Sequence, residues 1–158
     1  MKKNTIYLSV TLLLLIVVYF FTSNNSISQK DYKYKVKIHR DNWGVPHIYG
    51  NTDEDASYGL AYAHAEDDFE TIQDILLASR GILASVKGKD SAPIDYLVGL
   101  LKIWDDVDKN IDEISPKVLS ICNAYADGIN KYMEKNPRKV IGDIYPVKGK
   151  DIIAGFTF

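Results

Sequence analysis

The sequence has few of the residues on which common enzyme sites are built. It contains one cysteine, Cys122, and three histidines among 158 residues. A single cysteine cannot form an internal disulfide. The G-x-S-x-G motif of serine hydrolases and the phosphate-binding P-loop are also absent from the sequence. Residue chemistry alone therefore identifies no active site in this chain.

The chain also lacks an excess of positive charge. It carries 19 Lys and Arg against 21 Asp and Glu, which gives a net charge of −2. The one dense basic run, residues 135–139, is interrupted by Asn136 and Pro137 and indicates a solvated loop. Without a basic stripe we expect no nucleic-acid partner. The length and the apolar content of 46% suit one ordinary domain.

Long apolar runs are confined to the N-terminus, where residues 6–21 follow two lysines. A small-x-small cleavage site lies at Ser26–Ser28, as in a secretory signal peptide. The apolar run is shorter than the roughly 20 residues that span a bilayer comfortably. We predict a cleaved signal peptide over residues 1–28, or alternatively an uncleaved anchor through the apolar run. Residues 29–158 are then exported to the periplasm or outside the cell, or face the periplasm from the anchor.

Residues 34–50 predict a β-hairpin or a pair of strands. Apolar and charged residues alternate from Tyr34 to His39, which is typical of a half-buried strand. Residues 41–44 (DNWG) are turn-forming, and residues 45–49 predict a second short strand. His47 lies in that second strand, where we interpret it as a packed, hydrogen-bonded residue rather than a catalyst.

A helical pattern begins at Thr52 or Asp53, either of which can cap a helix. Apolar residues then recur every three or four positions, at Tyr58, Tyr62, Ala65, Phe69, Ile72 and Leu76. Arg80 followed by Gly81 predicts the end of the helix. The sequence therefore predicts one continuous helix about 40 Å long, at 1.5 Å per residue.

Two further helical stretches are expected. The first covers residues 94–107, with Leu97, Leu101 and Trp104 on one face. The second begins at Ser115–Pro116, a cap followed by proline at the first helical position. Its apolar face consists of Val118, Cys122, Tyr125, Ile129 and Tyr132. A buried, inert thiol is therefore the expected state of the cysteine.

Two local features of the C-terminal half, a glycine within a helix and a terminal apolar run, lead to further predictions. Gly128 lies inside the last predicted helix, where glycine costs about 1 kcal/mol relative to alanine. This predicts close packing against another backbone. Asp151 is expected to open another element, and residues 152–158 form an apolar run with nothing polar after it. We expect such a run to continue into a larger domain, which makes the chain a truncated one.

The residues 59–70 (GLAYAHAEDDFE) present the strongest candidate for a metal site. His64, Asp67 and Asp68 are three and four residues apart, so they share a helical face. Two of these side chains, such as His64 and Asp68, plus a third ligand from elsewhere could bind a metal in a small exported metalloprotein. The segment lacks the His-x-x-x-His pair that makes such a site specific. The favoured alternative is a structural role, in which an aspartate forms buried hydrogen bonds to the hairpin.

Several of these motifs together resemble the α-chain of the penicillin acylase family. Residues 36–50 (VKIHRDNWGVPHIYG) resemble its opening, and residues 58–68 (YGLAYAHAEDD) resemble its first long helix. Three further motifs and the turn at Gly88–Lys89 follow in the family's order: residues 78–81 (ASRG), 125–130 (YADGIN) and 146–151 (PVKGKD). The resemblance covers most of the chain after residue 29. Residues 91–96 and 104–107 resemble the aculeacin and acyl-homoserine lactone acylases more than the phenylacetyl-specific ones.

The resemblance implies an α+β fold, namely the N-terminal α-chain portion of an αββα N-terminal-nucleophile hydrolase. Members are exported precursors that cut themselves into α and β chains, and a serine exposed at the start of the β-chain is the nucleophile. Its α-amine, with a pKa near 8, can act as the base for its own hydroxyl. This implies an acylase of penicillin, acyl-homoserine lactone or lipopeptide type.

No residue of this chain inherits a catalytic, cofactor-binding or metal-binding role from the resemblance. None of the 10 glycines precedes Ser, Thr or Cys, as the self-cleavage junction would require. The expected partner is the remainder of the same precursor, with calcium possible in a full-length member and an acyl-amide substrate only in the complete enzyme. The chain alone is expected to be inactive. The alternative is a non-catalytic, membrane-anchored binding module on a relic acylase scaffold.

Overall fold

A computed structural model describes residues 33–157. The predicted signal peptide or anchor over residues 1–28, with its apolar run, lies outside the described residues. Two strands precede the helices, as the predicted α+β segment requires: β1 (Val36–Arg40), β2 (Pro46–Gly50), α2 (Asp53–Ser79), α3 (Ala84–Lys87), α4 (Ala92–Leu100), α5 (Ile103–Asn110), α6 (Pro116–Lys135) and α7 (Gly149–Thr157). No helix within residues 33–157 is both long enough and apolar enough to cross a membrane.

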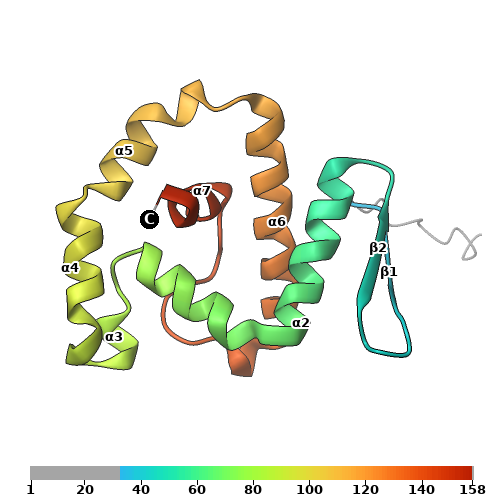
Figure 1. The fold of residues 1–158 in the computed structure, drawn as a ribbon, viewed down its shortest axis with the longest axis horizontal. Helices are drawn as coiled ribbons and strands as arrows, with labels where there is room; N and C mark the ends of the chain where they lie inside the picture. Colours follow the sequence, from blue (N-terminus) through green and yellow to red (C-terminus); the bar gives the residue numbers. More distant parts are fainter. Residues whose placement is uncertain (1–32, 158) are drawn as a thin grey trace, which may run out of the picture. The chain divides into compact units, whose positions relative to one another are not determined.

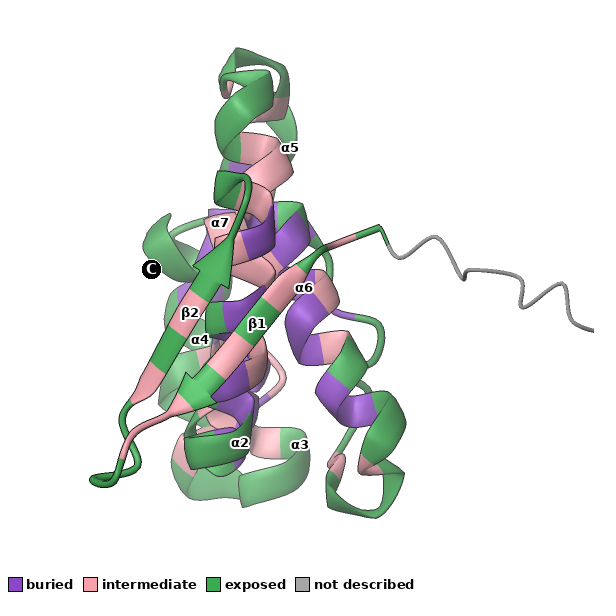
Figure 2. Ribbon diagram, turned by 90° about the vertical axis from the view of Figure 1, so that its right-hand side faces the viewer, coloured by how far each residue is buried: buried purple, intermediate pink, exposed green. Residues whose placement is uncertain are grey.

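The predicted hairpin is confirmed, with β1 and β2 antiparallel and Ile38 paired with Ile48. Its turn is built by Asp41, whose Oδ1 accepts hydrogen bonds from the backbone N–H groups of Trp43 (2.8 Å) and Val45 (3.0 Å). Gly44 completes the turn with a φ of +84°, a conformation that glycine adopts without strain. Partly buried and exposed residues alternate along β1, and the hairpin packs against α2 (Figure 2).

Helix α2 begins and ends where its sequence predicts. The Thr52 hydroxyl accepts a hydrogen bond from the Asp55 backbone N–H at 3.1 Å, and Gly81, with φ +68°, follows the last turn. The prediction of one continuous helix is wrong, because Asp68 has φ −148° and ψ 68°. The Asp68 carboxylate accepts a hydrogen bond from the Thr71 N–H at 3.2 Å and so caps the second half. Figure 1 shows that α2 changes direction partway along its length.

Helices α2 and α6 pack against each other and contain much of the core. Gly128 of α6 faces the Tyr58 carbonyl, and a Cβ added to it would lie 2.8 Å from the Cβ of Ala61. The predicted close approach of two backbones is therefore confirmed. In the predicted apolar face of α6, Cys122, Ile129 and Tyr132 are buried and Tyr125 is partly buried, whereas Val118 is 49% exposed.

The single helix predicted over residues 94–107 is two helices, α4 and α5. Lys102 separates them with φ +53°, a left-handed conformation that no α-helix can contain. The break changes which face is buried, so the predicted Leu97 and Leu101 are exposed. The residues that are buried instead form a small cluster with Ala154 of α7: Val98, Ile103 and Val107.

Helix α7 is the element whose opening was predicted at Asp151. It begins two residues earlier, at Gly149, and contacts α2, α5 and α6. In Figure 1 it lies inside the curve that these helices form. Its position brings the end of the described chain next to the two longest helices.

Candidate functional site

The three residues of the predicted metal site interact with three different groups. The ring Nδ1 of His64 lies 2.8 Å from the Tyr125 hydroxyl, Asp67 pairs with Arg40, and Asp68 caps the second half of α2. No group of three His, Cys, Asp or Glu side chains within residues 33–157 is arranged to hold a metal ion. The metal hypothesis therefore receives no support, and the structural alternative describes these residues better.

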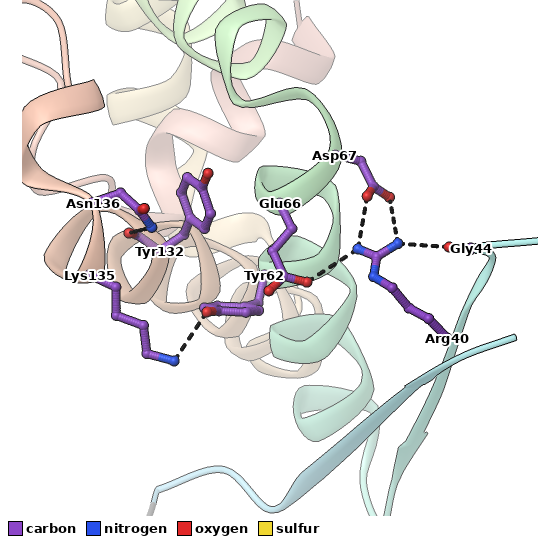
Figure 3. Close-up of a pocket in the computed structure, with 8 residues that line it drawn as sticks. All are labelled: Arg40, Gly44, Tyr62, Glu66, Asp67, Tyr132, Lys135 and Asn136. Carbon is purple, nitrogen blue, oxygen red and sulfur yellow. Dashed lines mark hydrogen bonds and ion pairs between the residues drawn. The ribbon is translucent and has the colours of Figure 1, made fainter. Parts of the chain in front are cut away.

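Arg40 connects the hairpin motif to the long-helix motif, and we call such a side chain, which holds two distant segments together, a clamp. Its Nη1 donates to the Gly44 carbonyl at 2.8 Å, and its Nη2 lies 2.8 Å from Asp67 and 3.2 Å from Glu66 (Figure 3). The hydrogen bonds that Arg40 donates to the carboxylates of Asp67 and Glu66 raise the pKa of Arg40 above its usual value. The expected hydrogen bond from an aspartate to the hairpin is thus present at Asp67. This hydrogen bond is not buried as expected, since the Asp67 side chain is 50% exposed.

A polar cleft of about 750 Å³ lies beside Arg40. On its other side, the ammonium group of Lys135 sits 4.8 Å above the Tyr62 ring and donates to the Tyr62 hydroxyl at 3.1 Å (Figure 3). Lys139 donates in the same way to the Tyr132 hydroxyl at 2.9 Å. The basic run at residues 135–139 is therefore more than a solvated loop, because two of its lysines cover tyrosines of the core.

A second clamp joins two other motifs that are 71 residues apart. Arg80, which follows α2, holds the buried carboxylate of Asp151 through two hydrogen bonds of 2.7 and 2.9 Å. It also donates to the backbone carbonyls of Asp143 (2.7 Å) and Pro146 (3.2 Å). The same carboxylate accepts the Lys148 N–H at 2.7 Å. The sequence pattern places Arg80 in a helix stop and in the motif at residues 78–81, but it does not indicate the partner, which is brought near by α6 and the loop after it.

A third clamp involves the motif at residues 125–130. The Asn130 side chain donates to the Val147 carbonyl at 2.7 Å and accepts the Val147 N–H at 2.8 Å. This reciprocal pair fixes the segment before α7 as a neighbouring strand would. Together, the three clamps show that the most recognisable polar motif residues position backbone segments relative to one another.

His47 and Cys122 were the two remaining candidates. The His47 Nε2 lies 3.2 Å from Asp41 Oδ2, and this hydrogen bond lowers the pKa of Asp41. His47 is hydrogen-bonded as predicted, although its side chain is 47% exposed rather than packed. Cys122 is a buried free thiol, and burial raises its pKa, which disfavours the thiolate needed for nucleophilic attack.

An apolar groove of about 810 Å³ runs between α2, α6 and α7. We use this name for the hollow lined mainly by apolar side chains from these helices, with Ile48 of β2 also in the lining. The hydrogen-bonded pair of His64 and Tyr125 lies on its wall. Its lining can bind apolar groups, whereas the polar cleft beside Arg40 presents charges that are already paired.

Glu54 gives the described residues their clearest pH dependence. The Ser120 hydroxyl donates to it at 2.6 Å, and this bond, with the Lys117 ammonium, lowers its pKa from 4.5 to about 2. A carboxylate with a lowered pKa stabilises the fold above pH 4.5, and this contribution is lost as the pH falls toward 2. We expect Glu54→Gln to lower the urea midpoint at pH 6 and to match the wild type near pH 2. Glu70→Gln, at an exposed carboxylate, is the control and should leave the midpoint nearly unchanged at both pH values.

Comparison with known proteins shows which family the chain resembles. The sequence profile of the family described as Penicillin amidase matches residues 35–150. Penicillin G acylase from Escherichia coli is 33% identical over 110 residues, which are 68% of this chain and 13% of that protein. Acyl-homoserine lactone acylase QuiP from Pseudomonas syringae pv. tomato is 28% identical over 115 residues, 73% of this chain and 14% of that protein. Relatives of both kinds thus match, and the chain spans about one seventh of their length.

A solved structure agrees with these sequence matches. The thermostable penicillin G acylase from Alcaligenes faecalis superimposes with a TM-score of 0.67 at 24% identity, over 80% of this chain and 72% of that one. At this identity the likeness shows the fold. It confirms the predicted fold class, a hairpin followed by helices that forms part of an acylase domain.

Proposed function

The chain belongs to the penicillin amidase family, and from this premise we propose that it forms the N-terminal segment of an exported amide hydrolase. In this proposal the segment is a scaffold, inactive alone, and the nucleophile is carried by a β-chain cut from the same precursor. The substrate is an acyl amide, of the penicillin or the acyl-homoserine lactone type.

The observation that carries the proposal is the use of the motif residues. The side chains of Arg40, Arg80 and Asn130 all form hydrogen bonds with backbone or carboxylate groups of other segments. A guanidinium so occupied orients secondary structure and is not free to bind a substrate carboxylate. The family motifs in this chain therefore support a scaffold role, in which rigid elements hold a site contributed by other residues.

The proposed chemistry needs only groups that the β-chain would supply. Its N-terminal serine attacks the amide carbonyl, its α-amine takes the hydroxyl proton, and an oxyanion hole stabilises the tetrahedral intermediate. The amine leaves with that proton, and water then releases the acyl group from the serine. The residues described here contribute to this reaction by keeping the scaffold in place.

A comparison of two proteins tests the proposal: the product of the complete reading frame and the 158-residue chain. We expect the complete product to release the amine from penicillin G or from an N-acyl-homoserine lactone, and the short chain to release none. N-terminal sequencing of the exported product identifies both the signal cleavage and the first β-chain residue. Alanine at that residue is the control and should abolish activity. Hydrolysis by the short chain, or a folded but inactive complete product, would contradict the proposal.

The alternative function, a non-catalytic module anchored through residues 6–21, is favoured by the apolar groove, which could hold a ligand. It predicts that the 158-residue chain is a compact monomer with a cooperative thermal transition. The scaffold proposal predicts instead that the chain alone exposes apolar surface and aggregates. Size-exclusion chromatography combined with a thermal melt distinguishes the two.

A further inference from the structure

The face of the hairpin turned away from α2 carries two of the three histidines of the chain. Val36 and Ile48 lie against Gly59 of α2, so the alternate positions of both strands point away from that helix. His39 of β1 and His47 of β2 occupy such positions, and both are exposed. The register pairs His39 directly with His47 across the hairpin. The two imidazoles are therefore neighbours on one open surface.

The spacing of a directly opposed pair suits a metal ion shared by two imidazoles. The Cβ atoms of residues opposed in an antiparallel pair are about 4.5–5.5 Å apart. Imidazole nitrogens lie about 2.0–2.1 Å from a bound Zn²⁺, so two nitrogens on one ion are roughly 3 Å apart. Rotation about the side-chain bonds of two exposed histidines can supply this difference without movement of the backbone. The pair can thus chelate one ion, with water at its remaining positions.

Asp41 orients one of the two rings. Its Oδ2 lies 3.2 Å from the Nε2 of His47, while its Oδ1 accepts the backbone N–H groups of Trp43 and Val45. Because a carboxylate only accepts hydrogen bonds, the neutral His47 ring carries its proton on Nε2 and keeps a lone pair on Nδ1. Histidines that bind metals commonly donate their other ring N–H to a carboxylate in this way. The turn thus holds His47 in the form that a metal ion requires.

We propose that His39 and His47 form a surface site for a divalent transition-metal ion of the Cu²⁺, Ni²⁺ or Zn²⁺ class, with Asp41 as the positioning residue. Imidazole suits these ions, whereas Ca²⁺ and Mg²⁺ prefer oxygen ligands. The site needs two protein ligands and water, so it does not require a convergent three-residue group, and residues 33–157 contain none. The inference is independent of amide hydrolysis and of the segment around His64.

The charges beside the pair partly balance each other. Lys37 lies on the same face two residues before His39, and its ammonium group repels a cation. Asp41 supplies the opposite charge at neutral pH, since the hydrogen bond from His47 lowers its pKa. Among the three ions, Cu²⁺ should bind most tightly, as the Irving–Williams order predicts. A bound ion would link β1 to β2 and stabilise the hairpin by mass action.

Titration with Cu²⁺ of the 158-residue chain, purified without a histidine tag, tests this proposal. We expect one Cu²⁺ at the pair near neutral pH, measured by equilibrium dialysis, and coupling to two nitrogens in its electron paramagnetic resonance spectrum. His39→Ala or His47→Ala should lower the affinity about a hundredfold, because a two-point chelate becomes a single ligand. His64→Ala is the matched control, since it removes the third histidine and leaves the pair intact. It should change neither the affinity nor the spectrum.

Two residues of the turn provide further readouts. Trp43 is 89% exposed and lies between the two strands, so Cu²⁺ bound at the pair should quench its fluorescence. Asp41→Asn keeps a side-chain oxygen for the turn and removes the charge. It should weaken Cu²⁺ binding about tenfold while coupling to two nitrogens remains. A change in the urea midpoint with unchanged Cu²⁺ affinity would remove Asp41 as the positioning residue.

Full Cu²⁺ binding by both His39→Ala and His47→Ala, or an equal loss in His64→Ala, would overturn the proposal. If the short chain aggregates, the complete product allows the same comparison, because other sites cancel in the difference between the wild type and His39→Ala. The outcomes also separate this inference from the proposed function. A complete product that hydrolyses no amide, yet loses one equivalent of Cu²⁺ in His39→Ala, would refute the hydrolase proposal and support the metal site.

Discussion

Asp151→Asn is expected to lower the free energy of unfolding of the chain by about 3 kcal/mol, the cost of breaking one partner out of a buried ion pair. The Asp151 side chain is 4% exposed and Arg80 is 17% exposed, so the remaining guanidinium loses its counter-charge away from water. The loss should release α7 from α2. Urea unfolding followed by circular dichroism measures it, and exposure of α7 should appear as faster proteolysis near residues 149–157.

The control for this change is an exposed ion pair on the same helix. Lys150 pairs with Asp108, and both side chains are well exposed, at 42% and 60%. Exposed pairs contribute at most about 1 kcal/mol, so Lys150→Ala should move the urea midpoint little. Equal effects of Asp151→Asn and Lys150→Ala would show that the Arg80 clamp does not hold the fold together. Arg80→Lys should also be destabilising, because an ammonium cannot replace the two parallel hydrogen bonds.

Gly128→Ala is expected to destabilise the chain by about 1–3 kcal/mol, the usual cost of overpacking a core. In an ordinary helix interior the same change would be stabilising, because alanine has the higher helix propensity by about 1 kcal/mol. The added methyl group would meet the Tyr58 carbonyl of the α2 backbone and the Cβ of Ala61, which is fixed directly to that backbone. Since neither can rotate away, the two helices must separate.

Gly99→Ala is the matched control for this prediction. Gly99 also lies in a helix, α4, and a Cβ at that position would meet nothing within 4 Å. Its replacement should therefore stabilise the chain by about 0.5–1 kcal/mol. Opposite signs of the two changes in urea unfolding would confirm close α2–α6 packing at Gly128. A stabilising effect of Gly128→Ala would contradict it.

The local features of the fold were predictable because neighbouring residues determine them. The caps at Thr52 and Ser115 and the stop at Gly81 use hydrogen bonds and dihedral angles within four residues. The hairpin follows from alternation and a turn sequence. The close approach at Gly128 was also readable, since a glycine in a good helix has few other reasons to be there. The family itself was recognisable from short motifs in order.

The two breaks in the predicted helices show where local patterns mislead. Asp68 lies within an apolar stripe that continues across it, so the periodicity predicts no interruption. Its carboxylate nevertheless forms a cap, which competes with the helical backbone. Lys102 interrupts the second stretch without any glycine or proline to announce it. Burial of Ile103 against α7, a contact between distant segments, accompanies the break.

The sequence by itself determined the family, the hairpin and the longer helices to within these breaks, and the absence of a recognisable active-site motif. These properties depend on residue identity and on spacing over a few turns. Only the tertiary structure decided what the motif residues do. Arg40 meets Asp67 across 27 residues, and Arg80 meets Asp151 across 71. Pairing of this kind depends on how the helices pack, because packing decides which charges far apart in the sequence come within hydrogen-bond distance of each other.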